Sequence, residues 1–555
     1  MPDNLNKPKS VHIFTFPFKW DIKPGGKSLA DTDFSGRTSL NDFHKILSTS
    51  HPPWREIHFK IAVPPDFNEY IYFHDFAREA LFPDGKNAGT LKQYEYNIKP
   101  GTRPVYKIKT IDSTGKPVTY ELDIEKILLT TYFTGVALLS FHLVNYKDLE
   151  FQEILRVNEF GRRIYPQFLV DSTTNLTGTV KNAFLADSLE VCIDDTGSFK
   201  EDFSYFDTIA NVNGNPNMLS HTIMGVLGGS FYTGQLDKGK EGIHISPILD
   251  DRMFVLCWWA DRTLCKTLAK YNKKSETYRY AENNDWFKLI FIDKESPSCN
   301  SIPMKKKLIT EHTYDRWIGT EESSLFGVTR YSFIMLNDDP GTFVKDHLKT
   351  MYSQMVQLAL AQRASILRFS GEAARIADMK EPENTTEKVS ELQKKYLQFI
   401  NKIYFREITA FEQGIDLYEK ITQAMKIERD IKELDREIEE LHHYASLQED
   451  KRNNRQLRLL TILGSLFLIP GFIIGFFGMN LFSSQLEVNA PGKLWVIAGS
   501  ILLVSFISWL VITLRTKGPE KMGPFKRLAL AVLILVVVLV LVMLIPGDLF
   551  TLIGV

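Results

Sequence analysis

Apolar residues are distributed very unevenly along this chain, and the C-terminal part is the most apolar. Residues 457–479 carry no charged side chain except Arg458, and 494–514 and 528–545 are two further runs without charge. As a helix, the first run is about 35 Å long, enough to cross a hydrocarbon core of about 30 Å. A buried helix of a soluble protein seldom stays apolar on every face, so three successive runs predict a polytopic membrane protein.

Basic residues flank these runs asymmetrically, which predicts their orientation. The loop at 480–493 holds a single basic residue, Lys493. We therefore expect a multi-pass protein of the inner (cytoplasmic) membrane, with the N-terminal region and loop 515–527 in the cytoplasm. Loop 480–493 and the tail 546–555 would lie outside. The cations behind this prediction are Lys451, Arg452, Arg455 and Arg458 before the first run, and Arg515, Lys517, Lys521, Lys526 and Arg527 before the third.

Upstream of the first run, apolar residues recur every three or four positions between Ile415 and Leu447, with charged residues between them. No proline or glycine interrupts 415–456, so we expect one helix that continues unbroken into the membrane. Amphipathic segments at 343–379 and 386–411 would pack beside it and complete a helical stalk at 343–456. The charges at 435–440 predict a solvated face with i,i+4 pairs, and a cytosolic divalent-ion site is the alternative.

Residues 1–342 alternate short apolar runs with amphipathic stretches, which predicts a mixed α/β domain. A helix is expected at 149–158. The expected strands are 11–20, 57–63, 105–111, 136–144, 243–249, 253–259, 287–292 and 328–336.

Composition narrows the classes of function. The chain has 555 residues and a formal net charge of −1, so we expect no direct nucleic-acid partner. Its 4 cysteines form no Cys-x-x-Cys pair, which argues against a disulfide framework or a structural zinc site. No hydrolase, metalloprotease or cysteine-nucleophile motif is present, so we do not expect an enzyme. The apolar runs contain no Asp, Glu, Lys or His, so an ion path there must use carbonyl, hydroxyl or amide groups.

Three features of the α/β region are candidates for a ligand site. The glycine-rich segment 225–230 matches no Walker or dinucleotide fingerprint, so an inter-strand loop is favoured over phosphate binding. For 250–252 a salt-bridged turn is the simpler interpretation, and a ligand contact is the alternative. For 161–163 the interpretations are a helix cap with basic residues and, as the alternative, anion contacts. The candidate ligand-binding residues are Arg162, Arg163, Gly228, Gly229, Ser230, Asp250, Asp251 and Arg252.

A stripe of mostly small or polar residues follows the first apolar run at spacings of three and four. Such a stripe lets helices of an oligomer approach closely, or lines a narrow pore, and the pattern alone leaves both open. The stripe comprises Asn454, Leu457, Thr461, Gly464, Leu468, Gly471, Gly475 and Gly478.

The first run ends in Gly478-Met479-Asn480, and here the chain resembles the CorA superfamily of divalent-cation channels. The segments 444–450, 455–458 and 461–463 and the pair Pro470-Gly471 add to the resemblance. The tripeptide is specific because it follows a long charged helix and precedes a short loop and a second apolar run. Segment 325–332 is similar to the last strand of that family's cytosolic domain, so the resemblance covers about 319–514.

The resemblance implies a funnel-shaped homopentamer in a lipid bilayer, whose first run lines a central pore for Mg²⁺, which is also a possible regulatory ion. Asn480 would form the selectivity ring, because amide oxygens can hydrogen-bond the water shell that Mg²⁺ releases reluctantly. A leucine constriction would close the path by dewetting. Gly478 and Met479 would fix the turn at Asn480, Asn454 would lie at the cytosolic mouth, and Leu457, Thr461, Leu468, Gly471 and Gly475 would line the pore and gate.

The chain departs from the family pattern in three respects. Loop 481–493 lacks the usual Met-Pro-Glu-Leu, although Glu487 can still concentrate cations there. A third apolar run replaces a short basic tail, and the N-terminal region is longer than in the housekeeping transporters. Met479 favours the magnesium branch over the zinc branch.

Segments 11–18 and 132–143 are similar to CorA-like membrane proteins associated with type III CRISPR loci. This resemblance implies an antiviral effector that a nucleotide second messenger activates, either a cyclic oligoadenylate or an adenosylmethionine–AMP conjugate. The alternatives are a housekeeping transporter regulated by cytosolic Mg²⁺ and a membrane-anchored enzyme that binds or degrades nucleotides.

Overall fold

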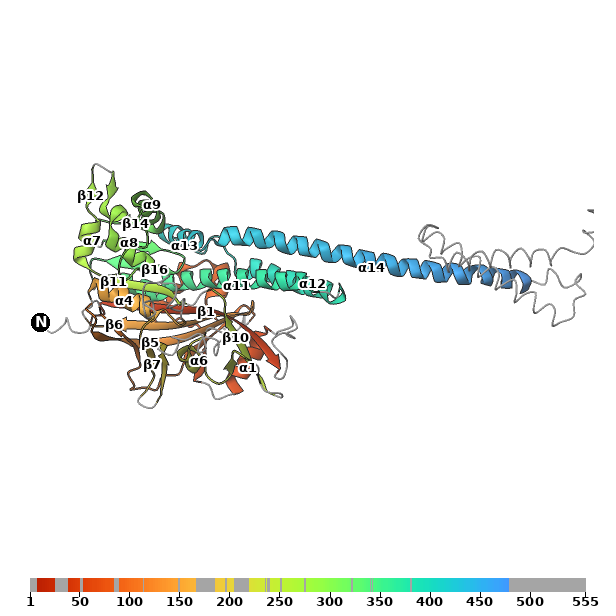
Figure 1. The fold of residues 1–555 in the computed structure, drawn as a ribbon, viewed down its shortest axis with the longest axis horizontal. Coiled ribbons are helices and arrows are strands. Elements are labelled where there is room, and N and C mark those ends of the chain that lie inside the picture. The colour runs from red at the N-terminus through yellow and green to blue at the C-terminus, as the bar shows by residue number, and fades with distance from the viewer. Residues whose placement is uncertain are drawn as a thin grey trace, which may run out of the picture. The chain divides into compact units, whose positions relative to one another are not determined.

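The structure is a computed structural model (Figure 1). The chain divides into two compact units, Met1–His442 and His443–Val555, and each is described by itself. The structure describes residues 7–478 except 25–37, 50–52, 84–88, 113, 148–149, 166–184, 195–196, 204–218, 235, 237–239, 250–251, 274–275, 321–322, 340, 342 and 380–381.

A 14-stranded sheet forms the body of the first unit, and its main path runs β14-β15-β16-β11-β1-β6-β5-β4-β7-β8. The strands of this sheet are β1 (Ser10–Pro24), β2 (Trp54–Ile57), β3 (Leu91–Tyr96), β4 (Val105–Ile111), β5 (Pro117–Tyr132), β6 (Val136–Asn145), β7 (Ser188–Cys192), β8 (Ser198–Asp202), β9 (Phe231–Tyr232), β10 (Glu241–Pro247), β11 (Phe254–Ala260), β14 (Thr313–Trp317), β15 (Ser324–Val328) and β16 (Ser332–Asn337). The strands β12 (Tyr271–Asn272) and β13 (Thr277–Tyr278) form a separate pair.

The helices of the sheet region are α1 (Leu40–Thr49), α2 (Pro64–Tyr72), α3 (Asp75–Leu81), α4 (Phe151–Gly161), α6 (His221–Leu227), α7 (Arg262–Leu268), a 3₁₀ turn η2 (Arg279–Glu282), α8 (Asn284–Phe291) and α9 (Ile302–His312). They are followed by α10 (Val344–His347), a π-helical turn η3 (Leu348–Tyr352), α11 (Ser353–Ala377), α12 (Pro382–Lys402), α13 (Glu412–Ala424) and α14 (Ile427–Gly478).

The central strands β1 and β6 are almost continuously apolar because helices cover both faces of the sheet at this point. Every residue of β6 is buried. The even-numbered residues of β1 from Phe14 to Ile22 belong to one core together with residues of α1, α4 and α6. Helix α11 packs against β1 and β6, and none of its described residues belongs to that core. The long helix α11 therefore lies on the opposite face of the sheet (Figure 1).

One proline marks the point at which β1 changes neighbours. Along one edge, β1 pairs with β11 up to Thr15 and with β10 from Phe18. Pro17 lies between these two registers and has no N–H to donate, so a change of partner costs no ladder hydrogen bond there.

The mixed α/β prediction is confirmed, and so are most of the predicted strands. The strand predicted at 57–63 is wrong beyond Ile57, and α2 begins at Pro64. Residues 287–291 of the predicted strand 287–292 belong to α8, because the Asn283 side chain accepts a hydrogen bond from the Trp286 N–H at 2.8 Å and caps the helix. The segment 328–336 is split into β15 and β16 by a turn, closed by the bond from the Thr329 N–H to the Ser332 carbonyl at 2.9 Å.

The predicted unbroken helix from 415 to 456 is also wrong. Helix α13 ends at Ala424 and α14 begins at Ile427, because Lys426 adopts a left-handed backbone with φ 59°. The predicted apolar stripe is buried on both sides of this break, as at Ile421 and Leu434, whereas Leu447 is exposed. Helix α14 itself then continues to Gly478.

Within the part of the chain that the structure describes, no helix combines the length and the apolar character needed to cross a membrane. The apolar runs at 494–514 and 528–545 lie outside the described residues.

The break at Lys426 gives a stability prediction. We expect Lys426→Gly to raise the free energy of unfolding by about 0.5 kcal/mol, because glycine relieves the left-handed strain but loses more chain entropy. The control Lys432→Gly removes an exposed lysine inside α14 and should lower it by about 1 kcal/mol. Urea titration of the purified protein in detergent measures both, and an equal loss in the two variants would contradict the assigned break.

Candidate functional site

The predicted pore residues that the structure describes lie on one continuous helix, α14. Asn454, Leu457 and Thr461 are exposed, and the Thr461 hydroxyl donates to the Leu457 carbonyl at 2.8 Å. A Cβ added at Gly464, Gly471 or Gly475 would meet no heavy atom of the described chain within 4 Å. Leu468 and Gly478 also lie in α14, whereas Met479, Asn480 and Glu487 are outside the described residues.

An uninterrupted α-helix places positions three and four apart on one face. The continuity of α14 from Ile427 to Gly478 is therefore what the predicted stripe requires. The pore-lining role of this face, and the selectivity role of Asn480, remain predictions.

Residues 225–227 of the glycine-rich segment end α6, and 228–230 form the turn between α6 and β9. Gly228 ends α6 with φ 90°, a value that favours glycine, and its N–H donates to the Met224 carbonyl at 2.9 Å. The Ser230 carbonyl accepts from the Ile243 N–H at 2.9 Å, and Ser230 is buried. Gly229 lies between them. The predicted inter-strand loop is therefore the end of a helix and the turn that follows it, and the phosphate-binding alternative stays a prediction.

The other two predicted features come together, although they are far apart in sequence. Arg163 at the end of α4 forms an isolated β-bridge with Arg252, and the Arg162 carbonyl accepts from the Met253 N–H at 2.8 Å. Asp250 and Asp251, which precede Arg252, lie outside the described residues.

Arg162 and Arg163 are both buried and share one carboxylate, that of Glu159. Arg163 Nη2 lies 2.7 Å from Glu159 Oε1, and Arg162 Nη2 donates to Glu159 Oε2. Burial alone would raise the pKa of Glu159, but the charges of the two arginines lower it below its ordinary value. Burial lowers the pKa of Arg162, and its Nε has no hydrogen-bond partner.

Sequence reasoning missed a second group of arginines next to Arg252. The Cζ atoms of Arg252 and Arg363 lie 4.6 Å and 5.4 Å from the centre of the Tyr331 ring. Arg330 precedes Tyr331 in the β15–β16 turn, and its carbonyl accepts from Arg363 Nη1 at 3.1 Å. The signal available in the sequence was an arginine at position 363 inside the apolar stretch of α11.

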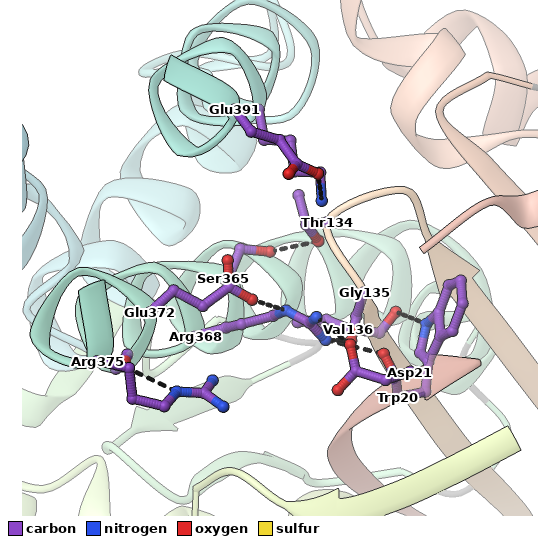
Figure 2. A network of polar contacts seen from close by, with 12 residues as sticks. Trp20, Asp21, Thr134, Gly135, Val136, Ser365, Arg368, Glu372, Arg375 and Glu391 are labelled. Atoms are coloured by element: carbon purple, nitrogen blue, oxygen red, sulfur yellow. Dashed lines mark hydrogen bonds and ion pairs between the residues drawn. The ribbon is translucent and has the colours of Figure 1, made fainter. Parts of the chain in front are cut away.

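Helix α11 is connected to the sheet by a buried arginine, Arg368, whose nitrogen atoms all have hydrogen-bond partners (Figure 2). We call this set of contacts the joint. Arg368 Nη1 donates to the carbonyls of Trp20 at 2.8 Å and Gly135 at 2.6 Å. Its Nη2 contacts Asp21 Oδ1 at 2.6 Å, and its Nε contacts Glu372 Oε1 at 2.8 Å. Burial alone would lower the pKa of Arg368, but the two carboxylates raise it above its ordinary value.

Close packing fixes the position of this guanidinium group. Gly135, in the β5–β6 turn, has φ 78°, and a Cβ there would lie 2.3 Å from Arg368 Nη1. A hydroxyl pair, Thr134 with Ser365 at 2.8 Å, joins the same turn to α11 (Figure 2). Helix α11 is thus tied by hydrogen bonds to β1 and to the β5–β6 turn.

Comparison with protein families finds a match in the C-terminal part of the chain. Residues 358–515 match the family described as CorA-like Mg2+ transporter protein. These residues form a CorA-like domain. The predicted resemblance to the CorA superfamily is thereby confirmed for these residues.

Two other comparisons add little to the CorA-like assignment. The solved "structure of the full-length CmaX protein" is 15% identical, and the match covers 47% of this chain and 88% of that chain. Its TM-score of 0.16 is too low to show a shared fold. Comparison with curated proteins gives no match.

Both Arg363 and Arg368 lie near the start of the CorA-like domain. Arg368 binds backbone and side-chain groups of Trp20, Asp21 and Gly135, which belong to the sheet region that precedes it. Its contacts therefore join the CorA-like helices to the α/β region.

We expect Arg368→Met to lower the free energy of unfolding by about 3 kcal/mol, because the buried Glu372 and the partly buried Asp21 would lose their cation. Arg375→Met is the matched control, since Arg375 is exposed on the same helix and should change stability by less than about 0.5 kcal/mol. Urea titration in detergent compares them, and similar stabilities would refute the structural role of the joint.

Proposed function

We propose that this protein is a CorA-like pentameric channel for divalent cations of the Mg²⁺ type, gated through its α/β region. The observation that carries the proposal is the family match, which begins in α11 and continues through α14 to residue 515. The matched segment therefore includes the first two apolar runs, 457–479 and 494–514.

In this proposal, 457–479, 494–514 and 528–545 are the membrane spans of an inner-membrane protein. Residues 1–342 form the cytoplasmic sensor domain and 343–456 the stalk. The asymmetry of basic residues around the apolar runs supports this orientation.

The first span of each subunit would line the pore, and Asn480 would provide the outer ring of amide oxygens. Three glycines on one face of α14, at 464, 471 and 475, support close approach of five such helices. Leu457 and Leu468 would form the hydrophobic constriction, where dewetting blocks ions until the helices tilt.

The stimulus is proposed to be a nucleotide second messenger of the type III CRISPR response, such as a cyclic oligoadenylate or an adenosylmethionine–AMP conjugate. The buried joint at Arg368 supports gating from the α/β region, because a rearrangement of β1 or of the β5–β6 turn must move α11 or break these bonds. The opposing possibility is a housekeeping transporter that responds to cytosolic Mg²⁺ alone.

The selectivity assignment gives a flux prediction. We expect Asn480→Ala to reduce Mg²⁺ uptake into liposomes about tenfold or more, because the ring would lose the oxygens that hydrogen-bond the water shell of Mg²⁺. Asn489→Ala, in the same predicted loop, is the matched control and should retain wild-type uptake. Equal uptake by the two variants would remove Asn480 from the selectivity filter.

A further inference from the structure

We propose that Arg330 and Arg363 bind a phosphate group of a small anionic ligand. The site lies where the β15–β16 turn meets the middle of α11, close to the start of α14. It differs from the predicted glycine-rich loop and includes residues that the sequence patterns did not single out.

The first observation is the environment of Arg363. Its side chain is 4% exposed, and its Nη1 donates to the Arg330 carbonyl at 3.1 Å, while its guanidinium group lies 5.4 Å from the centre of the Tyr331 ring. These contacts leave its Nε buried without a hydrogen-bond partner. A buried charged donor without a partner is costly, and proteins normally avoid it.

The second observation is the neighbouring cation, Arg330. Its Nε is also buried and unpartnered, and among the described residues its side chain makes no hydrogen bond or ion pair. Burial and then the charge of Arg330 lower the pKa of Arg363. The two positive charges therefore repel each other, and each guanidinium group has an Nε donor without a partner. An anion bound by both groups would relieve this repulsion.

The chemistry of the two residues selects the class of ligand. A guanidinium group presents a planar fork of N–H donors that matches the oxygens of a phosphate, and Nε is one of these donors. Arg330 and Tyr331 are half-buried, so the turn borders solvent, whereas Arg363 and both Nε atoms lie below the surface.

The acidic residue that acts on Arg363 belongs to the helix that continues into the predicted pore. The negative charge of Asp430, in α14, raises the pKa of Arg363. The hydrogen bond that Asp430 Oδ1 accepts comes from another residue, Arg429, whose Nη2 lies 2.6 Å away. A phosphate at Arg363 would compete with Asp430 for the same cation. This consequence for gating rests on the proposed channel function, whereas the binding itself does not.

The test is binding of inorganic phosphate to the purified full-length protein in detergent. The unfolding temperature is measured with sodium phosphate against sodium chloride at equal ionic strength. We expect phosphate to stabilise the wild type, and Arg330→Gln to weaken the apparent affinity about tenfold or more. Because Arg330 makes no described side-chain bond, this variant should fold normally. Arg363→Lys retains the charge but lacks the fork, and it should also lose affinity.

Arg103→Gln is the matched control, since Arg103 is an exposed arginine paired with Asp123 on the sheet and should leave phosphate binding unchanged. No specific effect of phosphate on the wild type, or full retention of the effect in Arg330→Gln, would overturn the proposal. AMP and adenosine form the second arm. A stronger effect of AMP that Arg330→Gln abolishes supports a nucleotide phosphate, whereas equal effects of AMP and adenosine contradict phosphate recognition.

This experiment requires no transport. Absence of Mg²⁺ flux would therefore refute the channel and leave the anion site standing, and loss of phosphate binding would refute the site and leave the channel standing.

Discussion

The arrangement of this protein depends on one buried guanidinium group. Arg368 satisfies two carbonyls and two carboxylates that come from β1, the β5–β6 turn and α11 itself. An arginine in this position is stable only because each of its charged partners is also held in place, and the loss of any one would leave a buried charge uncompensated. The helix and the centre of the sheet are therefore constrained to move together.

Helix α11 also carries an arginine, Arg363, whose hydrogen-bond donors are not all satisfied. Arg363 and Arg330 are adjacent cations with unpartnered Nε donors, whereas Arg368 has a partner for each donor group that the structure describes. Fully bonded charges make a rigid joint, and incompletely bonded ones make a site whose energy an anion can change. We infer that α11 combines a mechanical connection with a place where a ligand can act on it.

Much of the architecture follows from simple patterns in the sequence. The long apolar runs at β1 and β6 predict buried central strands, and the recurrence of apolar residues from Ile415 predicts the buried face of the last helices. The break at Lys426 could not be predicted, because a left-handed lysine is fixed by its surroundings and not by a helix-breaking residue type. The segment at 287–292 was misassigned because its apolar run fits a strand as well as a helix, and the Asn283 cap decides between them.

For the candidate sites, the sequence indicates some of the residues but not which of them lie close together. Arg162, Arg163 and Arg252 could be proposed from local sequence, but their proximity depends on the bridge between the residues that follow α4 and those that precede β11. Arg330 and Arg363 could not be joined from sequence, since a turn and a helix 33 residues apart bring them together.

The most direct test of the channel proposal is Mg²⁺ flux into liposomes containing the purified protein, with candidate nucleotides and internal Mg²⁺ varied in one series. The account predicts flux that appears only when a nucleotide is present. Flux that ignores nucleotides and falls as internal Mg²⁺ rises would contradict nucleotide gating, and no flux under any condition would contradict the channel itself.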